Sequence, residues 1–193
     1  LVAAHIGRAL DIPERSVPTY VTALSGVFLI NQLPSWGTNL EKRAISKPKV
    51  FLSDTALATS LAGLEPEALE MNISSTLTGG ICEAFVANEL LKQKAWSSVD
   101  YRLFHFRTST GKEVDLVLES RSRDVVGVEV KAAMSIQPKD FAGLRYLQQV
   151  AGDSFRAGIV LYTGKDVLPM GENLWAMPIS TLWHGSVSYT HLR

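Results

Sequence analysis

The chain has 193 residues, of which 46% are hydrophobic and 20% are charged, a composition that fits one large folded domain or two small ones. Lysine plus arginine equal aspartate plus glutamate, at 19 each, so any binding of nucleic acid must rest on a local patch. The single cysteine, Cys82, excludes an internal disulfide. The sequence also shows no secretory signal and no apolar run long enough to cross a bilayer, which favours a cytoplasmic protein without a membrane partner.

Residues 1–64 have the pattern of helix, turn, helix and a two-stranded basic wing. This order resembles a winged helix-turn-helix domain whose first helix is missing. Leu1 already lies inside a helical pattern, so we expect the chain to be part of a longer protein. The predicted elements are helices over Val2–Leu10 and Ser16–Leu24, and strands that begin at Val27 and at Lys49.

This first unit has two interpretations that the residues leave open. In the first it contacts DNA through Arg15 and Thr19 of the second helix and through Lys42 and Arg43 of the wing, mainly at phosphates. In the second it is a spacer that docks onto protein. The second helix carries one basic residue, Arg15, which weakens the DNA interpretation.

Residues 65–78 include a run rich in serine, threonine and glycine, which predicts a linker. Residues 79–185 then form a second domain, in which a helix, three strands, a helix and two strands predict a mixed central sheet in an α/β (α+β) fold. Residues 186–193 break the pattern, and we expect them to be a foreign tail. The predicted elements are Ile81–Lys94, Tyr101–Thr108, Glu113–Leu118, Val125–Lys131, Asp140–Val150, Phe155–Tyr162 and Leu174–Ile179.

The predicted strands Glu113–Leu118 and Val125–Lys131 form a hairpin. Three charged residues interrupt these two apolar strands. Strand alternation places Glu129 and Lys131 on one face of the second strand. On the first strand, it places Asp115 on one face and Val114, Leu116 and Leu118 on the other face. Charges inside apolar strands need partners, and two carboxylates on adjacent strands can share a magnesium ion. The alternative is a solvated sheet face that carries a cross-strand pair of glutamate and lysine.

A third carboxylate, Glu83, lies on the apolar face of the preceding helix with Val86, Ala87 and Leu90. A metal site shared with the hairpin would give it a partner; alternatively, the nearby helix N-terminus stabilises it. Arg107, at the end of the first strand, can reach a phosphate or pair with Glu113.

The order of these acids resembles that of the PD-(D/E)xK nuclease superfamily, whose pattern matches Glu83, Asp115, Glu129 and Lys131. The sequence departs from it at Val114, which stands where the superfamily has proline. Across residues 5–183 the chain resembles more closely the C-terminal part of prokaryotic AAA+-type ATP-binding proteins, the domain of unknown function 4143. The strings that carry this likeness are LPSWGTNLEKRAISKPKVFLSD, GGICEAFVANELLKQ, FHFRTSTGKEVDLVLE, VGVEVKAA and GIVLYTG.

The resemblance implies a restriction-endonuclease-like αβββαβ domain in which Glu83, Asp115 and Glu129 hold magnesium. Lys131 would position the attacking water. It also implies an N-terminal ATPase domain as a partner in the full-length protein; the present chain has no GxxxxGK[ST] loop and no ATP site of that kind. Two functions stay open: a magnesium-dependent phosphodiesterase acting on DNA, and a non-catalytic module that docks the ATPase onto DNA or protein.

Overall fold

Apolar, β-branched segments of the second half of the chain form one six-stranded sheet. The computed structural model describes residues 3–39, 47–65 and 75–183. The strands are β3 (Tyr101–Arg107), β4 (Glu113–Ser120), β5 (Val125–Lys131), β6 (Phe155–Tyr162), β7 (Leu168–Gly171) and β8 (Leu174–Pro178).

The order of the strands in this sheet is β3-β4-β5-β6-β8-β7. The pairs β5–β6 and β6–β8 are parallel and the others antiparallel, so the predicted mixed sheet of an α/β fold is confirmed. Strand β7 is additional to the predicted elements. It contains Pro169 and Gly171 and lies at the sheet edge, where strands tolerate both residues.

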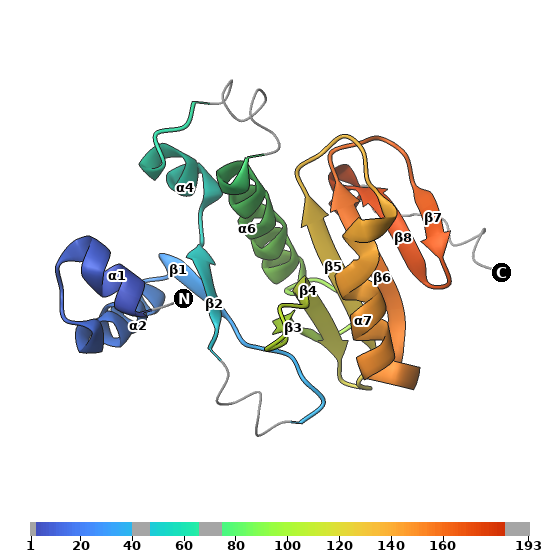
Figure 1. Ribbon diagram of the computed structural model, residues 1–193, viewed down its shortest axis with the longest axis horizontal. Coiled ribbons are helices and arrows are strands. Elements are labelled where there is room, and N and C mark those ends of the chain that lie inside the picture. The colour runs from blue at the N-terminus through green and yellow to red at the C-terminus, as the bar shows by residue number, and fades with distance from the viewer. Residues whose placement is uncertain (1–2, 40–46, 66–74, 184–193) are drawn as a thin grey trace.

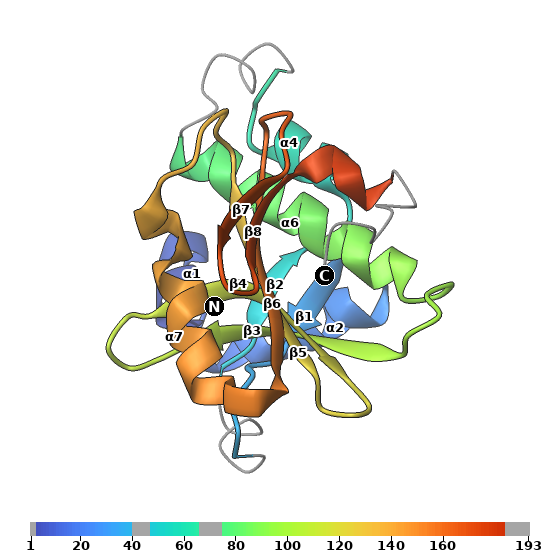
Figure 2. The same ribbon diagram turned by 90° about the vertical axis from the view of Figure 1, so that its right-hand side faces the viewer.

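One helix covers each face of the sheet, as Figures 1 and 2 show. Helix α6 (Thr76–Gln93) buries Val86, Ala87 and Leu90 against Leu116 and the other strand residues of one face. Helix α7 (Ala142–Ala151) buries Leu144 and Leu147 in the cluster on the other face. Because the Ser75 hydroxyl caps the Thr78 amide, α6 begins at Thr76, before the predicted start at Ile81.

A β-bulge in β4 decides where its side chains point. Phe104 pairs with Val117, but Phe106 pairs with Val114, so β4 has one more residue than β3 in this interval. As a result Val114 packs in the α7 cluster, whereas Leu116 packs in the α6 cluster. The prediction that Val114, Leu116 and Leu118 share one face is therefore wrong, because the alternation shifts at the bulge that contains Asp115.

The described residues of the first unit form the helices α1 and α2, a two-stranded antiparallel sheet and the helix α4, with α1 and α2 at one end of the molecule (Figure 1). Strand β1 begins at Ile30 rather than at the predicted Val27, because Phe28 adopts a left-handed φ of 60° between helix and strand. The elements are α1 (Ala3–Leu10), α2 (Val17–Gly26), β1 (Ile30–Leu33), β2 (Lys49–Leu52) and α4 (Thr55–Leu61).

Hydrogen bonds dock this small sheet onto the larger domain. Asn88 of α6 accepts a bond of 2.8 Å from the Asn31 side chain and donates one of 2.9 Å to the Leu52 carbonyl. The chain after β1 runs beside β3, where the His105 amide donates to the Pro34 carbonyl at 2.9 Å. The two units therefore share a polar and a backbone interface. In the described ranges, no helix combines the length and apolarity that crossing a membrane requires.

Candidate functional site

The bulge places the Asp115 carboxylate where the pairing of β4 and β5 ends. The last backbone pair is Leu116 with Val128. Beyond it, the Val130 amide donates to Asp115 Oδ2 at 2.9 Å, so a side-chain oxygen takes the place of a backbone acceptor. Asp115 thus lies between the separating strand ends, where it can meet groups from both sides of the sheet.

Glu129 of β5 is hydrogen-bonded to the Asp115 side chain and is almost fully buried, with 8% of its side chain exposed. Burial raises the pKa of Glu129 to about 9, with further increases from the charge of Asp115 and from their hydrogen bond. The Lys131 ammonium, 3.7 Å from Glu129 Oε2, acts in the opposite direction. Glu129 is therefore protonated at neutral pH.

Glu83 of α6 is, like Glu129, a neighbour of Asp115, and we call Glu83, Asp115 and Glu129 the acidic cluster. Burial is the largest cause that raises the pKa of Glu83, followed by the charge of Asp115. The Lys49 ammonium of β2 pairs with Glu83 Oε1 and lies 3.8 Å from Asp115 Oδ1, which lowers the pKa of Glu83. The sequence singled out Lys49 only as part of a basic wing, so its place in the cluster is new.

Helix α7 comes close to the cluster at Gly143. A Cβ atom at this position would lie 2.0 Å from the Glu113 carbonyl oxygen and 2.8 Å from Glu129 Oε1. Real side chains do not approach so closely, so the absence of a side chain lets α7 pack against the end of β4. Gly143 is a second site residue that the sequence did not indicate.

The residues predicted to bind nucleic acid do not gather at the cluster as a group. Arg15 and Thr19 are exposed on the first unit, and Lys42 and Arg43 lie outside the described residues. Arg107 ends β3 beside the cluster and pairs with Glu113, its Nε 3.7 Å from Oε2. Of the two roles predicted for Arg107, the pairing with Glu113 is thus observed.

A cleft of 370 Å³ opens from the acidic cluster between β2, β3 and β4. His105 lies inside it with its Nε2 3.2 Å from the Lys47 carbonyl oxygen, and burial lowers the pKa of this histidine. Basic and acidic side chains both line the cleft, and the basic ones suit a ligand that carries negative charge. The charged lining residues are Lys47, Lys49, Arg107, Glu113 and Asp115.

The donor set of the cluster fits magnesium in its chemistry, because three carboxyl groups offer hard oxygen ligands. A buried carboxyl group with a raised pKa, such as that of Glu129, is also a group whose ionised form a cation would stabilise. In the described ranges, however, no three Asp, Glu, His or Cys side chains are gathered closely enough to hold a metal ion. The ammonium of Lys49 occupies the position between two of the three carboxylates.

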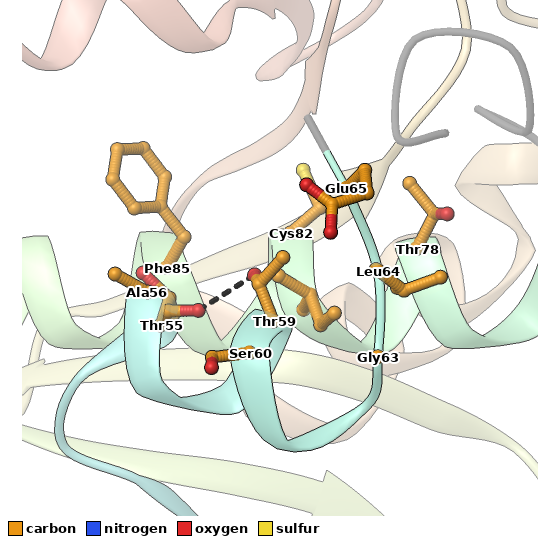
Figure 3. A pocket seen from close by; sticks show the side chains of 11 residues that line it. Thr55, Ala56, Thr59, Ser60, Gly63, Leu64, Glu65, Thr78, Cys82 and Phe85 are labelled. Atoms are coloured by element: carbon orange, nitrogen blue, oxygen red, sulfur yellow. Dashed lines mark hydrogen bonds between the residues drawn. The ribbon is translucent and has the colours of Figure 1, made fainter. Parts of the chain in front are cut away.

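A second cavity, of 670 Å³, lies between α4 and α6 (Figure 3). Its threonine hydroxyls are used locally: Thr59 Oγ1 donates to the Thr55 carbonyl at 2.7 Å. Cys82 lines this cavity, and burial, followed by the charges of Glu83 and Asp115, raises the pKa of its thiol to about 11. The thiol is therefore protonated at neutral pH and is not an activated nucleophile.

Comparison with known proteins places two families along the chain. Residues 78–182 match the family described as "Domain of unknown function (DUF4143)", and residues 1–68 match "Domain of unknown function (DUF8612)". The curated relatives include the uncharacterized proteins Rv2008c of Mycobacterium tuberculosis and Mb2031c of Mycobacterium bovis. Each is 31% identical over 178 residues, which cover 91% of this chain and 37% of the relative. No solved structure matches the chain.

Proposed function

The chain belongs to the DUF4143 family, and from the acidic cluster beside Lys131 we propose that its second unit is a magnesium-dependent phosphodiesterase acting on DNA. The observation that carries this proposal is the pair formed by the buried Glu129 and the partly buried Asp115, with Lys131 at 3.7 Å from Glu129. A structural role alone does not require a buried carboxyl group beside a second one, because an apolar pair would stabilise the same position better.

Each group of the site has a role that follows from its place. Oxygen atoms of Glu83, Asp115 and Glu129 would hold the magnesium ion, which when bound would polarise a phosphate and stabilise its developing negative charge. Lys131, on the more exposed side of Glu129, would donate a hydrogen bond to the attacking water and to the phosphate oxygens. The water oxygen would bond to phosphorus and lose a proton to solvent, while one ester P–O bond would break and its leaving oxygen would take up a proton. The products would be two shorter strands, one with a phosphate end and one with a hydroxyl end.

The proposed fold of this unit is restriction-endonuclease-like. Its support is the order α6, β3, β4, β5, α7, β6, with the three acids on the first helix and on two adjacent strands. For the first unit we propose a winged helix. The helix pair α1 and α2 and the antiparallel pair β1–β2 support it, and the exposed Arg15 and Thr19 on its surface are candidate DNA contacts.

A second candidate function is a non-catalytic docking module of a larger ATPase. It is favoured by the match of the chain to only 37% of its relatives' length, which leaves room for an ATPase domain in such proteins. It is also favoured by the ion pair of Lys49 with Glu83, since an acidic cluster that binds an internal lysine can be purely structural. In this alternative the chain recruits DNA or protein without cleaving it.

A magnesium titration with a panel of labelled substrates tests the proposal. Single-stranded, duplex and branched DNA, with RNA of the same sequences, are incubated with the chain at increasing magnesium concentrations. The proposal expects cleavage of at least one DNA form that depends on magnesium and stops with EDTA. If every form stays intact with magnesium and with manganese, while one of them is bound, the docking function is the correct one.

A further inference from the structure

We propose that Lys49 is a resident counter-ion of the acidic cluster, which occupies the cation position in the free protein and must leave Glu83 and Asp115 before a divalent cation binds there. This inference rests on the proposed magnesium site and adds to it a residue from the first unit of the chain. It predicts that the two units are coupled through the occupancy of the site.

The charges around the cluster support an exchange of cations rather than a simple addition. The Lys49 ammonium contacts the carboxylates of both Glu83 and Asp115, and the Lys131 ammonium lies 3.7 Å from Glu129 Oε2. A divalent cation that entered beside Lys49 would meet an ammonium group at the same carboxylate oxygens. Like charges at such short range repel strongly in a half-buried site, so one of them has to leave.

Lys49 is held at this position by contacts on both sides of it in the chain. On one side, the Asn88 side chain of α6 accepts a hydrogen bond from Asn31 of the paired strand β1 and donates one to the Leu52 carbonyl at the end of β2. On the other side, His105 contacts the Lys47 carbonyl at 3.2 Å. The backbone of β2 is therefore fixed to both α6 and β3, and the position of the ammonium is a consequence of the fold.

The side chain of Lys49 can leave without movement of that backbone. Its flexible four-carbon stem carries a compact ammonium group, and 38% of the side chain is exposed, so it can turn toward the cleft. Lys47 and Arg107 line the same cleft, which makes it a suitable place for a phosphate group. Lys131, by contrast, contacts Glu129 and stays available for its proposed role.

Calorimetric titration of magnesium and of manganese into the parent chain and into Lys49→Met tests this exchange. Lys92→Met is the matched control, because Lys92 also pairs with a carboxylate of α6, that of Glu89, but away from the cluster. Without its competitor, Lys49→Met should bind the cation about ten- to a hundredfold more tightly than the parent. Lys92→Met should bind it as the parent does.

The outcomes separate this inference from the proposed function. Equal cation affinity of Lys49→Met and the parent would overturn the role of Lys49 and leave the magnesium site standing. Absence of cation binding in every variant, including Lys49→Met, would overturn the site itself. Lys49→Gln repeats the test with a polar side chain if removal of the ion pair makes Lys49→Met too unstable to fold.

The parent chain supplies an independent readout through acetylation of its lysines, followed by mass spectrometry. Without a divalent cation, Lys49 should react more slowly than the exposed Lys47, because its ammonium group is paired. Magnesium should raise the reaction rate of Lys49 toward that of Lys47 and leave that of Lys92 unchanged. An unchanged rate for Lys49 under conditions where calorimetry detects bound magnesium would contradict the exchange.

Discussion

The Lys49 ammonium of β2 pairs with the Glu83 carboxylate of α6, and this ion pair joins two units of the chain that match different families. The same ammonium lies 3.8 Å from Asp115 of β4. A side chain of the first unit therefore completes the charge balance of a site whose acids all lie in the second unit. This link gives the first unit a direct part in the charge balance of the acidic cluster.

Magnesium should raise the melting temperature of the chain, because the proposed site exists in the folded acidic cluster and not among the dispersed carboxylates of the unfolded state. At ten times its dissociation constant the expected shift is about 3 °C for a chain of this size. Differential scanning calorimetry with magnesium and with sodium at equal ionic strength measures it. A shift of the same size with sodium alone would show screening of charge, not a site.

The stability of the metal-free chain should fall as the pH rises from about 5 to 9. The pKa of Glu129 is about 9 in the folded chain and 4.5 in the unfolded one, so across this window the folded state holds a proton that the unfolded state has lost. For a full proton the free energy of unfolding falls by about 1.4 kcal/mol per pH unit. Below pH 4.5 this contribution is fully present.

Urea unfolding of the parent and of Glu129→Gln, in EDTA across this pH range, isolates the effect. Glutamine keeps the shape of the protonated carboxyl group but has no titration, so the stability difference between the two chains should change with pH as described. A constant difference from pH 5 to 9 would show that the pKa of Glu129 is not raised in the folded chain.

Substitution of two glycines by alanine should change stability in opposite directions. In Gly143→Ala the new methyl group meets the Glu113 carbonyl and the Glu129 carboxyl group, so we expect a loss of about 2 kcal/mol. Gly80 lies in α6 with nothing within 4 Å of the Cβ position, so Gly80→Ala should gain about 0.5–1 kcal/mol from helix propensity. Chemical denaturation measures both, and equal effects would contradict the close approach of α7.

Helical and strand periodicity predicted the order of the elements. Strand alternation predicted which face of a strand some of the site residues take. In β5 the alternation is regular, so it placed Glu129 and Lys131 on one face, opposite Val128 and Val130 of the α6 cluster. In β4 the same rule failed at Val114 because of the bulge. A bulge depends on the pairing of β4 with β3, and the sequence of β4 alone does not reveal it.

The contact of Lys49 with the cluster could not be predicted from the sequence, for a different reason. It joins residues far apart in the sequence, and no local pattern states which carboxylate a basic strand residue will meet. The sequence did not indicate Gly143 for the same reason. Only a glycine fits at this position, because α7 packs against the end of β4, and that packing is not visible in the sequence.

Lys131→Ala should abolish cleavage while folding and DNA affinity stay close to those of the parent. Lys131 is partly exposed, and in the proposed mechanism it acts on the attacking water and the developing charge, so its loss should appear in kcat, by about 10²- to 10⁴-fold, and little in KM. Single-turnover cleavage and filter binding separate the two effects. A parallel loss of DNA affinity would mean that Lys131 binds substrate instead.

The most direct test of the central claim compares magnesium-dependent cleavage by the parent and by Asp115→Asn, purified side by side. Asp115 is the shared partner of Glu129 and Lys49, and the substitution removes one carboxylate ligand while it keeps the side-chain oxygen that accepts from the Val130 amide. The account predicts that the parent cleaves DNA in proportion to its concentration and that Asp115→Asn binds the same DNA without cleaving it. Equal cleavage by both chains, or cleavage by neither, would contradict it.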